Sequence, residues 1–178
     1  KKDFDAVVLT AGSTLGRDLN IPGRELKGIH LAMEFLPLQN KRCEGDEVPD
    51  ENFISAAGKN VVIIGGGDTG ADCLGTSHRH GAKAIVQLEL LPKPPNGRDQ
   101  TMPWPYWPTI LRTSSAHEEG GERDWSVSTK AFLGENGQVK QLQCVRLEWV
   151  NEGGRMQMKE VAGSEFTIDA DLVLLAMG

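Results

Sequence analysis

Continuous apolar runs, flanked by glycine and polar residues, are the clearest structural signal along the chain. Residues 60–64 (NVVII) and 84–91 (AIVQLELL) are such runs, and residues 68–80 between them have helical character. Gly81 follows that helix at the position where a glycine commonly terminates one. Strands that are buried on both faces of a parallel sheet have this apolar composition. The pattern therefore predicts a βαβ unit over residues 60–91, about the thirty residues that such a unit needs.

A related motif stands near each end of the chain. Residues 5–12 (DAVVLTAG) and 171–178 (DLVLLAMG) each start with an acidic residue, continue as an apolar run and close with an alanine-containing tripeptide that ends in glycine. Both runs predict buried parallel strands.

The region between the first run and residue 60 has weaker signals. Residues 32–36 predict a short helix that stops before Pro37, because a proline disfavours helical backbone at the residue that precedes it. The polar and acidic composition of residues 39–52 predicts an exposed loop.

The C-terminal third alternates apolar and polar residues, with Gly/Asn-containing segments at 134–137 and 151–154. Alternation that is interrupted by such turns predicts an antiparallel β meander over about 126–168. Residues 92–108 hold most of the nine prolines and include the segment PWPYWP at 103–108. Proline continues neither a helix nor a central strand, so this Pro/Trp-rich part should be a stiff, extended surface segment.

These elements predict an α/β fold in which a Rossmann-like parallel sheet with a βαβ unit is joined to an antiparallel meander. The chain has 178 residues, the length of one ordinary domain. We therefore expect a single domain over residues 1–178, with its βαβ core at 60–91.

Charge and composition exclude several kinds of partner. The formal net charge is −6, and no basic stretch is long enough to follow a nucleic-acid backbone or an anionic membrane. No apolar run approaches the roughly 20 residues that span a bilayer, and the first residues, KKDF, do not resemble a signal peptide. We expect a cytoplasmic protein that binds neither nucleic acid nor a membrane.

No metal site is expected. The three cysteines, Cys43, Cys73 and Cys144, are too far apart for a Cys-x-x-Cys site. His78 and His80 are two residues apart on the predicted helix and point to different faces. His30 and His117 stand alone in the sequence.

A glycine fingerprint joins the first strand of the βαβ unit to its helix. The segment Gly65-Gly66-Gly67-Asp68-Thr69-Gly70 satisfies G-x-G-x-x-G between a strand and a helix, with a second strand at the distance that the dinucleotide-binding fingerprint requires. Gly65 permits the tight turn, Gly67 lets a pyrophosphate approach the backbone, and Gly70 lets the helix pack on the sheet. The amino end of the helix would bind the diphosphate.

The acidic residue at the end of the second strand indicates which dinucleotide is bound. Glu89 lies about 20 residues beyond the glycines, where a carboxylate can accept hydrogen bonds from the ribose hydroxyls and repel a 2′-phosphate. This favours NAD(H) over NADP(H). The alternative is that Glu89 is a solvated strand end and that Lys93 or Arg98 contacts a phosphate.

The residues quoted above, together with further segments, resemble the small (β) subunit of glutamate synthase. The match runs essentially end to end. The LELLP segment at 88–92 is more similar to the NADH-using plant and fungal branch than to the bacterial NADPH branch. The segments that carry the resemblance are Ala11-Gly12, IPGRELKGIH at 21–30, VIIGGGDTGADC at 62–73, RHGAK at 79–83, LELLP at 88–92 and PWPYWP at 103–108.

The resemblance implies a flavoprotein in which a nicotinamide domain is inserted into an FAD domain. Residues 5–12 and 171–178 would then be the crossover strands, and this chain would be the NAD(P)H-binding domain excised from the larger protein. FAD and 4Fe-4S clusters are expected in the parent protein and are not expected to bind to this chain. The parent would pass a hydride from NAD(P)H to FAD and electrons onward to a large subunit that makes glutamate from glutamine and 2-oxoglutarate.

The resemblance also implies a role for Asp72, because related flavoproteins place an acidic residue at this helix position beside the nicotinamide amide. An ordinary carboxylate on the helix surface is the alternative, and Asp68 or Thr69 could instead cap the helix. Trp104 and Trp107 either stack on adenine or wedge the Pro/Trp-rich segment onto the domain or a partner. Residues 112–119 could mark a contact face.

Two other functions stay open at this point. The chain could be a nucleotide-binding or interaction module without turnover, or the electron-input module of another flavin oxidoreductase.

Overall fold

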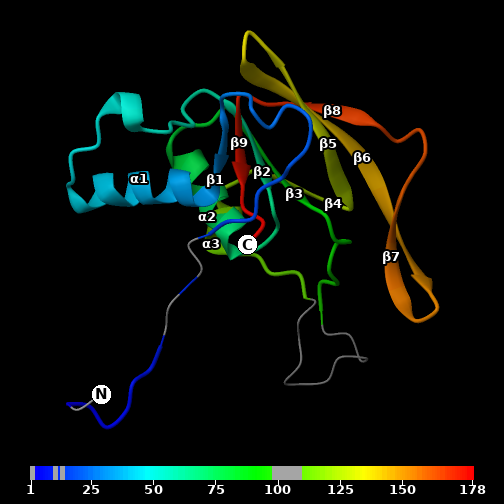
Figure 1. The fold of residues 1–178 in the computed structure, drawn as a ribbon, viewed down its shortest axis with the longest axis horizontal. Coiled ribbons are helices and arrows are strands. Elements are labelled where there is room, and N and C mark those ends of the chain that lie inside the picture. The colour runs from blue at the N-terminus through cyan, green and yellow to red at the C-terminus, as the bar shows by residue number, and fades with distance from the viewer. Residues whose placement is uncertain (1–2, 10–11, 13–14, 98–109) are drawn as a thin grey trace.

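A computed structural model describes residues 3–9, 12, 15–97 and 110–178, and its centre is a five-stranded parallel sheet (Figure 1). The strand order is β1-β9-β2-β3-β4. Strand β9, late in the sequence, lies between the early strands β1 and β2 and pairs with both. The strands are β1 (Ile29–Leu31), β9 (Leu172–Leu175), β2 (Asn60–Ile64), β3 (Ala84–Glu89) and β4 (Glu122–Trp125).

Strand register aligns the carboxyl ends of the three central strands. Ile64 of β2 pairs with Leu88 of β3 and with Leu175 of β9. At the amino end, the Asp171 carboxylate accepts hydrogen bonds from the backbone and side-chain nitrogens of Asn60, at 3.0 and 3.1 Å. The strands predicted at 60–64, 84–91 and 171–178 are therefore confirmed, although β3 ends at Glu89 and β9 ends at Leu175.

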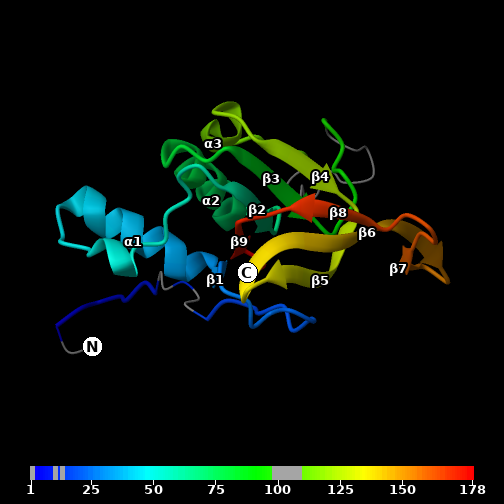
Figure 2. The same cartoon turned by 90° about the horizontal axis from the view of Figure 1, so that it is seen from above.

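Helices cover one face of the parallel sheet, as Figure 2 shows from above. They are α1 (Ala32–Glu44), α2 (Asp68–Arg79) and α3 (Ser115–Glu118), with a short 3-10 helix η1 at Asp50–Asn52. Phe35 of α1 and Leu74 of α2 are fully buried against Ile63, Ile85 and Leu174. The helix predicted at 68–80 is confirmed, and Gly81 follows it with a φ of +79°.

The prediction that the first helix stops before Pro37 is wrong, and so is the prediction of a loop from residue 39. Helix α1 contains Pro37 and ends at Gly45, whose φ is +90°. A proline removes one backbone hydrogen bond from a helix. The residues after it, LQNKRCE at 38–44, are mostly good helix formers, and the buried Phe35 holds the first turns in the core.

An antiparallel layer covers the other face of the parallel sheet. Its strands are β5 (Val127–Glu135), β6 (Gln138–Glu152), β7 (Arg155–Glu160) and β8 (Phe166–Asp169). The 15-residue strand β6 pairs with all three others, so β7 and β8 both pair with β6 and not with each other. The predicted turns are confirmed, with positive φ at Asn136 and Gly137 and at both glycines of the β6–β7 turn. Leu142 and Val139 of this layer pack on Val62 and Val173 of the parallel sheet.

The strand predicted at 5–12 is not formed in the structure. Residues 3–9 have no strand assignment, and Val8 and Leu9 are 82% and 87% exposed. The parallel sheet ends at β1, and none of the described strands pairs with residues 5–9. An apolar run forms a strand only where a neighbouring strand accepts its hydrogen bonds.

Two parts of the predicted organisation lie partly or wholly outside the described residues. Thr10 and Ala11 of the predicted first strand are outside, as are Trp104 and Trp107 of the Pro/Trp-rich segment. Within the described part of the chain, no helix is long and apolar enough to span a bilayer.

Candidate dinucleotide site

The turn after β2 is shaped by backbone atoms of neighbouring strands. Gly65 has a φ of +130°, and its backbone N–H donates to the carbonyl of Leu88, at 2.8 Å. A Cβ at Gly65 would collide with the carbonyl oxygen of Ala176. Residue 65 is therefore restricted to glycine by both its backbone conformation and the approach of the segment after β9.

The other two fingerprint glycines have different surroundings. A Cβ at Gly70 would collide with the carbonyl oxygen of Gly65, so this glycine lets α2 pack closely on the turn. By contrast, no described atom lies within 4 Å of a Cβ built at Gly67. Gly67 is the N-cap of α2, and its carbonyl accepts the N–H of Ala71 at 3.1 Å. Space is therefore open beside the amino end of α2, where helix N–H groups lack intrahelical acceptors.

Glu89 reaches back from the end of β3 to the glycine turn. One carboxylate oxygen, Oε2, accepts the backbone N–H of Gly66 at 2.8 Å, and Oε1 accepts the N–H of Leu91 at 3.1 Å. A Cβ at Gly66 would collide with this carboxylate. Gly66 is thus a contact point between the turn and the acidic residue, a role that the fingerprint alone does not assign to it.

A cavity of about 800 Å³ lies at this edge of the sheet. It is large enough for a cofactor and is lined by residues of both layers of the protein. Most of the predicted site residues line it, and a smaller cavity of about 260 Å³ shares Thr69 and Ala176–Gly178 with it. The predicted residues in its lining are Gly65, Gly66, Gly67, Asp68, Thr69 and Glu89.

The segment before β1 supplies cavity residues that the sequence did not single out. Arg17 and Asp18 line the cavity, and the backbone N–H of Arg17 donates to the carbonyl of Gly178 at 3.3 Å. Arg17 therefore lines the same cavity as Gly67 and Asp68, at the amino end of α2. An arginine in a polar loop has no distinguishing pattern, and only the fold brings it to this edge.

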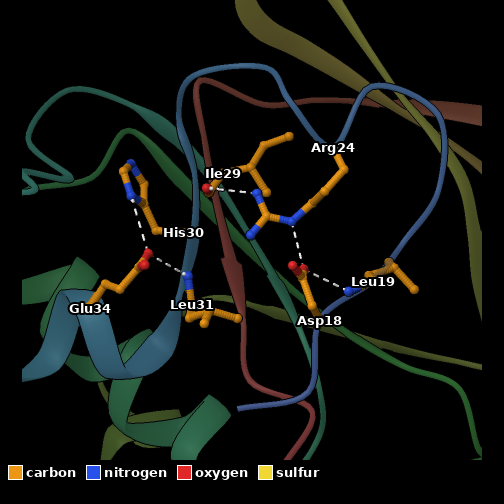
Figure 3. A network of polar contacts seen from close by, with 7 residues as sticks. All are labelled: Asp18, Leu19, Arg24, Ile29, His30, Leu31 and Glu34. Carbon is orange, nitrogen blue, oxygen red and sulfur yellow. Dashed lines mark hydrogen bonds and ion pairs between the residues drawn. The ribbon is translucent and has the colours of Figure 1, made fainter. Parts of the chain in front are cut away.

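A polar network holds that segment in place (Figure 3). The Asp18 carboxylate accepts hydrogen bonds from Arg24 Nε at 2.6 Å and from the Leu19 backbone at 2.8 Å, and Arg24 Nη1 donates to the carbonyl of Ile29 at 3.3 Å. The hydrogen bond from Arg24 lowers the pKa of Asp18. In the same view, Glu34 accepts the backbone N–H of Leu31 and so fixes the start of α1 next to β1.

Two cationic side chains lie near Trp125, on the strand that pairs with the end of β3. Trp125 of β4 is the register partner of Glu89. Lys93 Nζ and Arg123 Cζ lie 4.9 and 5.1 Å from the centre of the Trp125 ring. Both cations are therefore near the strand that borders Glu89, although neither is among the described cavity-lining residues. Arg98, the other predicted phosphate ligand, lies outside the described residues.

Gly70 and Asp72 are the predicted site residues outside the described lining of the main cavity, and the predicted side-chain caps of α2 do not form. Asp72 is exposed on the surface of α2 and does not belong to the described lining. Asp68 and Thr69 do not cap the helix, because Gly67 is the N-cap and Asp68 is the first helical residue. Among the described residues, no group of three His, Cys, Asp or Glu side chains is placed to hold a metal ion.

The architecture is shared with a class of oxidoreductase that handles pyridine nucleotides. The solved structure of Mycobacterium tuberculosis FprA in complex with NADPH superposes with a TM-score of 0.64 over 94% of this chain and 48% of FprA, at 16% identity. The α/β fold predicted from the sequence, with its Rossmann-like sheet, is thereby confirmed.

Sequence similarity is more specific. The chain is 55% identical, over its entire length, to the glutamate synthase [NADPH] small chain of Mycobacterium tuberculosis, and 52% identical over 99% of its length to the glutamate synthase [NADH] of Schizosaccharomyces pombe. It spans 36% of the first relative and 9% of the second. No protein-family model matches the chain. The chain is therefore homologous to one segment of the glutamate synthase small chain, and the resemblance seen in the sequence is confirmed.

Proposed function

We propose that the 800 Å³ cavity binds a nicotinamide dinucleotide and that this chain is the NAD(P)H-binding domain of a glutamate synthase small subunit. The observation that carries the proposal is the open space at Gly67, at the amino end of α2 and in the lining of a cavity at the carboxyl ends of β2, β3 and β9. In a doubly wound sheet, dinucleotides bind across the carboxyl ends of the strands at this kind of position.

The residues present fit the parts of such a cofactor. The diphosphate would lie against the first turn of α2, near Gly67 and the side chain of Arg17. The adenosine ribose would lie toward Glu89 at the end of β3. The nicotinamide half would extend the other way, toward Ala176 and the smaller cavity that shares Thr69. Asp72 is exposed on α2, and its role beside the nicotinamide is supported by the family resemblance alone.

The cofactor supplies the redox chemistry, in which a hydride carries two electrons to a flavin. The chain's own residues bind and orient the dinucleotide. The flavin would be held by an FAD domain of the same parent chain. The parent would use these electrons, with its large subunit and its 4Fe-4S clusters, to form glutamate from glutamine and 2-oxoglutarate. All three cysteines are free, which is typical of the cytoplasm.

We further propose that NADH is preferred over NADPH. A 2′-phosphate on the adenosine ribose would approach the Glu89 carboxylate, whose two oxygens are already fixed by backbone N–H groups. Fixed negative charge at that point should repel the phosphate. The names of the two relatives do not decide between the cofactors, since one is an NADPH protein and the other an NADH protein.

Calorimetric titration with both cofactors tests the site and the preference together. The wild-type chain should bind NADH at least about tenfold more tightly than NADPH. Glu89→Gln keeps an acceptor for the N–H of Gly66 but removes the charge, and it should bring the two dissociation constants close together. Glu122→Gln, an exposed carboxylate at the start of β4, is the matched control and should leave the ratio unchanged.

Two results would count against these proposals. A wild-type chain that binds neither cofactor contradicts the site. Tighter NADPH binding that Glu89→Gln does not alter, but that Lys93→Ala weakens, would assign the phosphate contact to Lys93 and remove Glu89 from the selective role.

A further inference from the structure

Gln87 is a polar side chain buried in the middle of β3, where an apolar residue would be expected. It is 2% exposed, and both ends of its amide are used. Nε2 donates to the carbonyl oxygen of Gly65 at 2.8 Å, and Oε1 accepts from Nε2 of His117 at 2.9 Å. A buried amide is tolerated only when it is hydrogen-bonded in this way. Its partners are the glycine turn and a residue 30 positions away on α3.

The hydrogen bonds of His117 have a defined direction. Nδ1 of His117 lies 3.1 Å from the backbone nitrogen of Ser114, and a backbone N–H can only donate. Nδ1 is therefore the acceptor, and the proton of the neutral ring is on Nε2, which donates to Gln87. Burial and the nearby charge of Arg123 lower the pKa of His117 and so favour this neutral ring.

Helix α3, which carries His117, is fixed against α2. Ala116 is buried, and a Cβ at Gly75 of α2 would be 3.0 Å from the Cβ of Ala116. Arg79 of α2 forms an ion pair with Glu119, just after α3. The position of His117 is therefore set by the helix that begins at the glycine turn.

The carbonyl that Gln87 holds and the N–H that Glu89 holds belong to the same peptide group, the one that joins Gly65 to Gly66. Because a peptide group is planar, fixing its oxygen and its N–H together fixes its orientation. Gln87 and Glu89 are two residues apart on β3, so their side chains are on the same face of the strand. Glycine on both sides of this peptide would otherwise leave it free to rotate.

We propose that Gln87 and His117 are positioning residues for dinucleotide binding. The hydrogen bonds that run from Ser114 through His117 and Gln87 to the carbonyl of Gly65 orient the Gly65–Gly66 peptide. The N–H of Gly66 then holds the Glu89 carboxylate in place for the adenosine ribose. The inference rests on the proposed function for the ribose contact. It adds that residues outside the cavity set the affinity.

Binding of NADH and of ADP-ribose to side-chain variants, followed by calorimetry, tests the inference. Gln87→Leu should raise both dissociation constants about tenfold, and His117→Phe should raise them about threefold. His117→Gln can still donate to Gln87 and should restore binding to within about twofold of wild type. Leu142→Val, a buried truncation in the antiparallel layer, is the control for lost stability and should leave binding unchanged.

The amide resonance of Gly66 gives a second readout, independent of any ligand. In a heteronuclear NMR spectrum it should move in Gln87→Leu and in His117→Phe, and it should stay in place in His117→Gln and Leu142→Val. If Gln87→Leu does not fold, the two His117 variants decide the matter, because His117 is only half-buried.

The outcomes separate this inference from the proposed function. A wild-type chain that binds no dinucleotide contradicts the proposed function. Wild-type binding with unchanged affinity in Gln87→Leu and His117→Phe overturns the positioning role and leaves the proposed function intact. Equal loss of binding in Leu142→Val would also overturn it, because the effect would then follow stability alone.

Discussion

At the end of β2 the chain turns against neighbouring strands, whereas at the end of β6 it turns in solvent. A Cβ at Gly65 would collide with the carbonyl of Ala176, just after β9. At Gly153 and Gly154, between β6 and β7, no described atom lies within 4 Å of a built Cβ. Strand β7 is exposed along its whole length, and Figure 1 shows the β6–β7 ribbon extending away from the two packed sheets. The first turn depends on three strands, and the second is held within its own hairpin, where the Asn151 side chain accepts the N–H of Gly154 at 3.0 Å.

This difference indicates where the chemistry can be located. The turn after β2 fixes a peptide group, a carboxylate and the start of a helix to one another, and the large cavity opens at the same place. Among the described residues, no side-chain hydrogen bond joins residues 151–158 of the ribbon to any of these atoms. We therefore expect substitutions at the two turns to have unequal effects on stability and on cofactor binding.

The largest expected effect is from Gly65→Ala. The new Cβ meets backbone atoms, which cannot move aside, and alanine is strained at a φ of +130°. The free energy of unfolding should fall by more than about 3 kcal/mol in urea titrations. Gly153→Ala, with a φ of +60° in open space, is the control and should cost about 1 kcal/mol. Equal losses of stability in the two variants would contradict the expected difference between the two turns.

Gly67→Ala should separate binding from stability within the turn after β2. Its φ of −81° suits alanine and the space around its Cβ is open, but alanine is a poorer N-cap than glycine, so the unfolding free energy should fall by about 1 kcal/mol, less than for Gly65→Ala. The added methyl group would occupy the place of the diphosphate, and the dissociation constant for NADH should rise at least about tenfold. Unchanged affinity, measured by calorimetry, would show that the diphosphate binds elsewhere.

Thiol reactivity should also distinguish the packed region from the surface. Burial raises the pKa of Cys73, on α2, to about 12, and that of Cys144, on β6, to about 11, whereas Cys43 is exposed. At pH 8 a disulfide reagent should label only Cys43 in the folded protein. Cys73 and Cys144 should react only after denaturant is added. Native labelling of Cys73 as fast as that of Cys43 would contradict the packing of α2.

The same raised pKa values predict how stability changes in alkali. The unfolded thiols ionise near pH 8.5, whereas the folded ones hold their protons to about 11 and 12. The unfolded chain therefore loses protons first, and the stability that the two thiols contribute should be present below about pH 8.5 and decline as the pH rises toward 12. Urea titrations of the wild type and of Cys73→Ala across this range measure the difference.

The smallest effect is expected on the ribbon. Met158 of β7 is 46% exposed, and Met158→Thr should change the unfolding free energy by less than about 0.5 kcal/mol, with no change in NADH affinity. Leu174→Ala, at a fully buried position in β9, is the contrasting variant and should cost about 3 kcal/mol. A large loss in Met158→Thr would mean that the ribbon is packed against something in solution.

Local patterns were sufficient to predict the parts of the fold in which the pattern and the environment agree. The apolar runs of β2, β3 and β9 predicted buried strands because both faces are covered, and the Asn-Gly and Gly-Gly turns predicted the hairpins. Strands β1 and β4 were missed because they have three and four residues and sequences, IHL and ERDW, without clear alternation. They form because β9 and β3 offer them free edges.

Two errors arose from the same kind of limit. Residues 5–9 have the composition of a strand, but none of the described strands pairs with them. Pro37 disfavours a helix locally, but the packing of Phe35 and the sequence after it sustain α1. In both cases the local pattern did not decide the outcome.

The candidate site, like the fold, was predicted only in part. Spacing alone located the glycines and Glu89. Arg17 and the pair Gln87 and His117 could not be found in this way, because a lone arginine, glutamine or histidine has no pattern until the fold places it beside Gly65 or the cavity.

The most direct test of the dinucleotide site is to titrate the isotopically labelled chain with NADH and to map the amide resonances that move. The largest saturable shifts should be those of Gly66 to Thr69, at the amino end of α2, and of Glu89 and Leu90 after β3, while the ribbon at 153–160 stays unchanged. An absence of saturable shifts at the glycine turn, or a map centred on another surface, would contradict the account.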